Sequence, residues 1–96
     1  MVKVKACRCP RCGDDIYSRT NKDLRVCSCG AIFVDGGFKS PRYGFLVKPK
    51  TKWVIHVDVL TIAANPKILY DDFVTGKDNF GKIKPRKGET KDGQGT

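Results

Sequence analysis

Five cysteines fall within the first 29 residues, and four of them form two close pairs, each followed by a glycine. The pairs lie in the strings Cys9-Pro10-Arg11-Cys12-Gly13 and Cys27-Ser28-Cys29-Gly30. A Cys-x-x-Cys-Gly turn places two thiolates on one side of a metal ion, and its glycine permits the tight backbone geometry. Two such turns supply four sulfurs, and a tetrahedral set of four thiolates suits zinc. The spacing therefore predicts one structural Zn2+ ion, held by Cys9, Cys12, Cys27 and Cys29.

The fifth cysteine, Cys7, leaves the choice of ligands open because five thiols compete for four positions. Cys7 and Cys9 have the same short spacing as Cys27 and Cys29. We favour Cys9 and Cys12 because they form the better turn, and the alternative set uses Cys7 in place of one of them. Iron bound by four thiolates would have the same sequence signature. Four protein ligands leave no coordination position open, so the predicted site is structural and not catalytic.

The number and context of the cysteines also bear on the compartment. An odd count argues against a closed disulfide framework and favours a reducing environment. The start of the chain, residues 1–5, carries lysines where a secretory signal needs an apolar run. No stretch reaches the roughly 18 apolar residues of a membrane span. The sequence therefore predicts a cytoplasmic protein without a membrane partner, in the host cytoplasm if the protein is viral.

A chain of 96 residues builds only a modest core, so a bound metal would supply additional stability to the fold. Short alternating segments predict strands, and residues 15–18 and 24–26 predict a hairpin that returns the second cysteine pair to the first. Further strands are expected at 31–34, 42–47 and 53–60. In the last of these, the face made by Trp53, Ile55, Val57 and Val59 is expected to lie in the core. Residues 67–74 fit either a helical turn or a final strand.

The predicted fold class is therefore small and mostly β. It consists of a zinc ribbon, with two cysteine knuckles on a hairpin, continued by an antiparallel sheet. We expect this domain to span residues 1–75. Residues 76–96 are basic and rich in glycine, and residues 85–96 contain no apolar residue other than Pro85. Because such a segment cannot help to build a core, a flexible C-terminal tail is expected.

The net charge of +9 indicates an acidic partner such as nucleic acid, although the charge is spread along the whole chain. Basic residues surround the cysteines and mix with aromatic residues further on. Positive charge holds phosphates, and exposed aromatic rings stack on bases. Trp53 itself is expected in the core. The candidate nucleic-acid-binding residues are Arg8, Arg11, Arg19, Arg25, Arg42, Lys50 and Lys52.

Nothing in the sequence assembles a catalytic site. His56 is the only histidine and has no partner motif for nucleophilic catalysis. The adjacent carboxylates Asp14-Asp15 and Asp71-Asp72 cannot chelate alone, because neighbours on a strand point to opposite faces. We therefore predict a protein that is not an enzyme, with no catalytic residues and no small-molecule substrate.

The string from Cys27 to Gly37 reads Cys-Ser-Cys-Gly-Ala-Ile-Phe-Val-Asp-Gly-Gly, and Pro41-Arg42-Tyr43-Gly44 follows it. Together with the upstream Cys-x-x-Cys-Gly, it resembles a group of small uncharacterised zinc-ribbon proteins of bacteriophages and some bacteria. The resemblance covers residues 7–45. It implies a phage origin and the ligand set Cys9, Cys12, Cys27 and Cys29, but no activity.

Two functions are therefore expected, both by binding. The first is binding to nucleic acid or to a nucleic-acid-processing complex. The alternative is a phage protein that inhibits or modulates a host enzyme or defence factor by protein–protein contact. A basic surface with exposed aromatic rings would favour the first, and an exposed apolar patch or a self-paired edge strand would favour the second.

Overall fold

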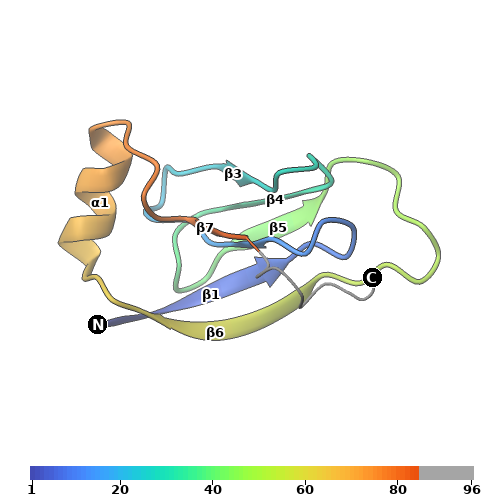
Figure 1. Cartoon of the computed structure of the whole chain (residues 1–96), viewed down its shortest axis with the longest axis horizontal. Coiled ribbons are helices and arrows are strands. Elements are labelled where there is room, and N and C mark those ends of the chain that lie inside the picture. Colours follow the sequence, from blue (N-terminus) through green and yellow to red (C-terminus); the bar gives the residue numbers. More distant parts are fainter. Residues whose placement is uncertain (85–96) are drawn as a thin grey trace.

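The computed structural model describes residues 1–84, which form two antiparallel sheets and a single helix (Figure 1). One sheet has the strand order β6-β1-β2-β7, and the other has the order β3-β4-β5. The elements are β1 (Val2–Arg8), β2 (Asp15–Ile16), β3 (Arg25–Val26), β4 (Ile32–Asp35), β5 (Arg42–Phe45), β6 (His56–Ile62), α1 (Pro66–Val74) and β7 (Lys82–Ile83). The predicted fold class, small and mostly β with antiparallel sheets, is confirmed.

The predicted hairpin between residues 15–18 and 24–26 is wrong. β2 pairs with β1, where Cys7 lies opposite Ile16, and β3 pairs with β4, where Val26 lies opposite Phe33. Each cysteine pair itself reverses the chain, so each occupies the tip of its own hairpin. The segment between the two hairpins crosses from one sheet to the other. There, the Ser18 hydroxyl oxygen lies 2.6 Å and 2.7 Å from the carbonyl oxygens of Thr20 and Asp23.

β6 begins at His56, later than predicted, and pairs with β1 along its whole length. The predicted core face is also wrong, because Val57 and Val59 are 37% and 60% exposed. The register explains the difference: Leu60 lies opposite Val4 and Ile62 opposite Val2, on the face that packs against the core. Residues 53–55 belong to the preceding loop.

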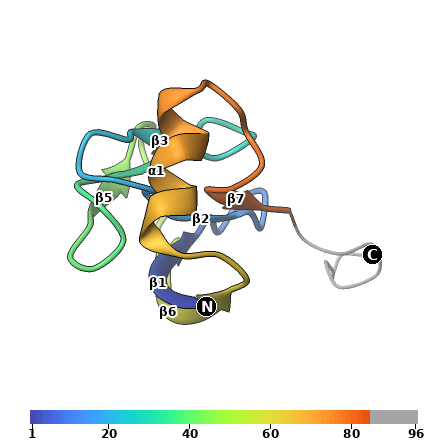
Figure 2. The ribbon, with the colours of Figure 1, turned by 90° about the vertical axis from the view of Figure 1, so that its left-hand side faces the viewer.

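The core consists of two clusters that adjoin one another along the chain, because Ala6 and Tyr17 of one are the neighbours of Cys7 and Ile16 of the other. The first lies beneath the cysteine turns and contains Cys7, Cys9, Ile16, Cys27, Ala31, Ile32 and Val34. The second lies beside the helix and contains Val4, Ala6, Tyr17, Ala64 and Leu69. The helix therefore covers the end of the sheets away from the cysteines (Figures 1 and 2).

Residues 67–74, which fitted either a helix or a strand, are helical. The Asn65 side chain caps α1 by accepting a hydrogen bond from the Ile68 amide, at 2.8 Å. Pro66 occupies the first turn, where its fixed φ is favourable and its missing N–H costs nothing. Leu69 and Asp72 form the buried side of the helix.

A buried ion-pair cluster links α1 to residues 19–23, which lie in the segment that crosses from one sheet to the other. Arg19 donates to Asp23 and to Asp72, in each case at 2.6 Å, and to the Lys77 carbonyl oxygen at 2.9 Å. Burial acts to raise the pKa of Asp72, but the Arg19 guanidinium and the backbone amides of Asn79 and Phe80 bond to the carboxylate and hold that pKa below its usual value. The charged carboxylate is thus the stable form inside the fold.

The predicted domain boundary at residue 75 is also corrected. Phe80 packs against the second core cluster, and the Tyr17 amide donates to the Gly81 carbonyl oxygen at 2.9 Å. β7 then pairs with β2. The folded part therefore extends at least to Ile83. The rest of the predicted tail, residues 85–96, lies outside the described residues.

Candidate metal centre

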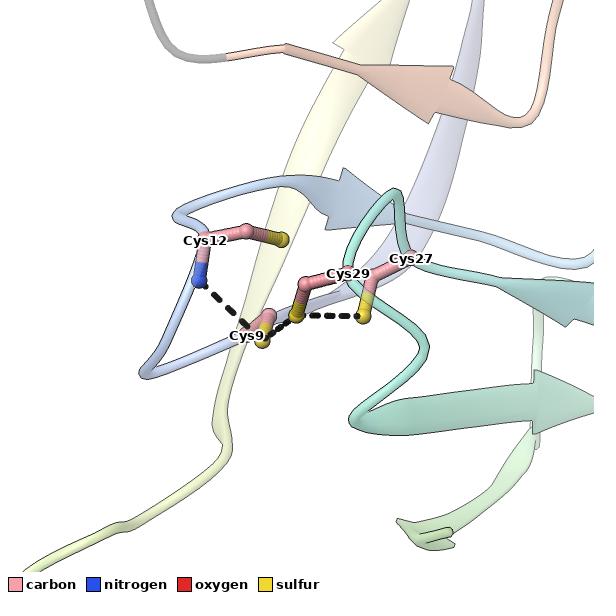
Figure 3. Close-up of side chains that lie close together, drawn as sticks. All are labelled: Cys9, Cys12, Cys27 and Cys29. Atoms are coloured by element: carbon pink, nitrogen blue, oxygen red, sulfur yellow. Dashed lines mark hydrogen bonds between the residues drawn. The ribbon is translucent and has the colours of Figure 1, made fainter. Parts of the chain in front are cut away.

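The four cysteines of the two turns bring their sulfur atoms together (Figure 3). All four sulfurs lie within 4.8 Å of one another, and the Sγ atoms of Cys9 and Cys27 lie 3.6 Å and 3.5 Å from that of Cys29. A tetrahedron with Zn–S bonds of about 2.3 Å has S–S edges of about 3.8 Å. The cysteines are free thiols, not disulfides. The cluster is thus consistent with one metal ion such as Zn2+.

The two turns share a backbone design despite their different lengths. In the first, the Cys9 amide donates to the Asp14 carbonyl oxygen and the Gly13 amide to the Cys9 carbonyl oxygen. In the second, the Cys27 amide donates to the Ile32 carbonyl oxygen and the Gly30 amide to that of Cys27. Gly13 and Gly30 have φ values of 80° and 78°, a region that favours glycine. This explains why each pair of cysteines is followed by glycine.

Backbone amides are aimed at the sulfurs, as a thiolate site requires. The amides of Arg11 and Cys12 donate to Cys9 Sγ at 3.3 Å and 3.4 Å, and the Ile32 amide donates to Cys27 Sγ at 3.4 Å. Burial acts to raise the pKa of the Cys29 thiol, but hydrogen bonds from the Arg11 guanidinium and from the backbone lower it to about 6. A cysteine with a lowered pKa is readily available as the thiolate that binds metal. Burial instead raises the pKa of the Cys9 and Cys12 thiols, which lose their protons only when a metal ion binds.

Cys7 is not part of this cluster. Its side chain is fully buried in the first core cluster, and it is not among the four clustered sulfurs. Burial, with a smaller contribution from the charge of Asp15, raises the pKa of the Cys7 thiol to about 11. Cys7 therefore remains a neutral core side chain, and the geometry favours the predicted set over the alternative that uses Cys7.

Asp14 has a role that the sequence analysis missed. Its buried carboxylate accepts a hydrogen bond from the Ser28 amide at 2.7 Å, so it ties the first cysteine turn to the second. The sequence analysis considered this residue only as a member of an adjacent carboxylate pair. Its position directly after Gly13 is the signal that would have identified it, because that position faces the partner turn.

The prediction that Arg19 and Arg25 bind nucleic acid at the surface is wrong, because both side chains are largely buried. Arg19 is buried among carboxylates, as described above. The Arg25 side chain is only 11% exposed and pairs with Asp78 at 2.6 Å. Both guanidinium groups hold the fold together.

The remaining candidates lie nearer the surface. The guanidinium groups of Arg8 and Arg42 are exposed and pair with Asp15 at 3.2 Å and Asp35 at 3.1 Å. Lys50 and Lys52 lie exposed in the loop between β5 and β6. Arg11 extends from the first cysteine turn, where it donates to the Cys29 carbonyl oxygen at 2.5 Å.

Arg11 and Lys50 converge on one aromatic ring, that of Trp53. The Arg11 Cζ atom lies 6.0 Å from the ring centroid of Trp53, and the Lys50 Nζ atom lies 5.9 Å from it. The ring of Phe45 stacks beside it, with centroids 6.3 Å apart. Trp53 is partly exposed, which corrects the prediction that it lies in the core. We call these four residues, Arg11, Phe45, Lys50 and Trp53, the Trp53 cluster.

Residues 1–45 match the family model described as Domain of unknown function (DUF7695). The match includes both cysteine turns and ends with β5, so it nearly coincides with the residues on which the zinc-ribbon resemblance rests. No curated protein and no solved structure matches the chain. Within residues 1–84, no helix has the length and apolar character needed to cross a membrane.

Proposed function

We propose that the protein is a non-enzymatic zinc-ribbon module that binds nucleic acid, or a nucleic-acid-processing complex, through the Trp53 cluster. The observation that carries the proposal is the convergence of two cationic side chains on a partly exposed tryptophan, beside the four-cysteine site. Cationic groups bind phosphates, and an aromatic ring stacks on a base with about 1–3 kcal/mol. The cytoplasm, that of the host if the protein is phage-encoded, is the proposed compartment because it keeps thiols reduced.

The metal has a positional role in this proposal. Arg11 lies between two ligands of the first turn, Cys9 and Cys12, so an ion bound there fixes the backbone from which Arg11 extends. The Arg11 side chain also bonds to the second turn. A structural Zn2+ ion would thus hold one cation of the Trp53 cluster in place. Four thiolates leave no open coordination position for catalysis.

We expect metallated protein to bind labelled single-stranded nucleic acid with an affinity that falls steeply as salt rises, because phosphate contacts release counterions. The chain contains one tryptophan, so its fluorescence reports on Trp53 alone. Single-stranded DNA, duplex DNA and RNA are compared over a salt series. Stacking predicts quenching of the fluorescence by single strands. Absence of binding even at low salt would reject the proposal and favour the alternative, a phage protein that inhibits or modulates a host enzyme or defence factor.

Replacing Lys50 and Lys52 together by alanine should weaken binding to every sequence and lower the slope of log K against log salt by about 1–2. Both side chains are exposed, so the fold should be unaffected. The matched control replaces Lys67 and Lys77 together by alanine, which removes two exposed lysines at the helix end of the molecule. An equal loss in the control would show that only the total charge matters and that the Trp53 cluster is not the site.

A further inference from the structure

β6 is an outer strand of its sheet, and its second edge carries no partner strand among residues 1–84. In Figures 1 and 2 it forms the lower boundary of the molecule, with β1 on one side only. Exposed strand edges present unpaired amide and carbonyl groups that template the addition of another strand. The question is therefore which strand fits this edge.

The direction of the backbone groups follows from the neighbouring strand. The Lys5 amide donates to the Phe38 carbonyl oxygen, on the side of β1 that faces away from β6. Lys5 lies opposite Val59, so these two residues form a pair without mutual hydrogen bonds. Val59 accordingly directs its N–H and C=O groups toward the free edge. By the alternation of an antiparallel ladder, Val57 and Thr61 do the same.

This edge lacks the features with which proteins usually block strand addition. β6 contains no lysine and no proline, and Asp58 is its only acidic residue. Val57 and Val59 are exposed beside the edge, and Val54 just before the strand is 57% exposed. Edges protected against pairing carry lysine, proline or bulges. The outward amide and carbonyl groups of β6 are therefore open to the addition of a partner strand.

We propose that the segment 53–61, which comprises most of β6 and the three loop residues before it, pairs antiparallel with the same segment of a second copy of this chain, about a two-fold axis at Val57. A symmetric pair must place outward-facing residues opposite one another, which allows an axis at any residue from Val57 to Thr61. An axis at Asp58 sets two carboxylates opposite each other, which is destabilising. Axes at Val59 and Leu60 set Asp58 opposite the apolar residues Leu60 and Ile62, and an axis at Thr61 leaves Asp58 without an opposite residue in β6.

The axis at Val57 gives a complementary pairing instead. His56 of each copy then lies opposite Asp58 of the other. The two residues form a pair without mutual hydrogen bonds, in which the side chains approach most closely. An imidazole N–H donates to a carboxylate whether or not the ring is charged. Val57 meets its own copy across the axis. In β1, Arg8 and Ala6 lie opposite His56 and Asp58, so Arg8 is the neighbouring charge on this face.

The first test is the mass of the full-length, zinc-loaded protein by light scattering over a concentration series, with twice the mass of one chain expected. Val57→Pro removes an outward N–H without removing a bond to β1, so it should give a monomer with unchanged zinc content. Val57→Thr keeps the amide and should remain dimeric. A wild type that stays monomeric into the millimolar range, or a dimer that persists in Val57→Pro, overturns the proposal.

A charge exchange tests the register. His56→Glu alone places two acidic groups opposite each other, and Asp58→Lys alone places a lysine opposite His56. Each should raise the dimer dissociation constant at least about tenfold. The double variant His56→Glu with Asp58→Lys restores opposite charges and should recover the dimer. Single variants that dimerise normally, or a double variant that stays monomeric, would show that β6 does not pair in this way.

Discussion

Cys9→Ala should abolish stoichiometric zinc binding and leave the protein largely unfolded. The variant keeps only three thiols of the cluster and also loses the sulfur that accepts the Arg11 and Cys12 amides. Structural zinc contributes on the order of 10–16 kcal/mol in small zinc-finger peptides, whereas a whole domain is stable by about 5–15 kcal/mol. One of the two core clusters is built around these cysteines. The measurements are zinc content after gel filtration and thermal unfolding followed by circular dichroism.

The matched control is Cys7→Ala, which removes a thiol that is equally buried but lies outside the cluster. It should retain one zinc ion per chain and lose only about 1 kcal/mol, as is typical of a small core substitution. A strong chelator should unfold this variant and the wild type alike, because both depend on the metal. If Cys7→Ala loses zinc while Cys9→Ala retains it, the ligand set is wrong.

Arg19→Met should lower the free energy of unfolding by about 3–5 kcal/mol, because it leaves two buried carboxylates without their cation. Asp23 and Asp72 are 2% and 5% exposed, and both bond to the Arg19 guanidinium at 2.6 Å. Methionine preserves the unbranched apolar stem of the side chain and removes the guanidinium group, so the missing charge dominates the effect. Urea unfolding at neutral pH measures the loss.

Arg42→Met provides the comparison, since Arg42 forms an ion pair with Asp35 at the surface. An exposed pair contributes at most about 1 kcal/mol.

The dependence of the free energy of unfolding on acid pH provides a second measurement of the Arg19 cluster. The folded pKa of Asp72 lies below its usual value, so its contribution is complete above the unfolded pKa of about 3.9 and is lost as pH falls through the folded pKa. Equal losses from both methionine variants would contradict the assigned role of Arg19.

Local sequence was sufficient to predict the four-cysteine cluster. The ligand set depends on turns of four or five residues, and glycines at positive φ are needed only where the chain reverses tightly. Hydrophobic alternation likewise identified the fold class and placed most strands close to their observed positions. These features are determined by residues that are near one another in the chain.

The errors concern features that depend on distant parts of the chain. Which face of β6 is buried follows from its register against β1, and no pattern within β6 decides that register. Arg19 was assigned to the surface because its partner Asp72 is 53 residues away. The tail was predicted to begin too early because β7 is only two residues long and is held by β2. A short strand of this kind has too few residues to show an alternating pattern.

The position of the four ligands in the chain has a consequence for how the protein is made. All four cysteines precede β6, α1 and β7, so both cysteine hairpins leave the ribosome before the strand that covers β1. A metal ion such as Zn2+, once bound by these four thiols, would then close the first core cluster during synthesis. Until β6 emerges, the nascent chain exposes the edge of β1. Arg19 cannot form its ion pair with Asp72 until α1 has also been synthesised. We therefore expect translation to yield a metal-bound N-terminal half first and the completed sheet last.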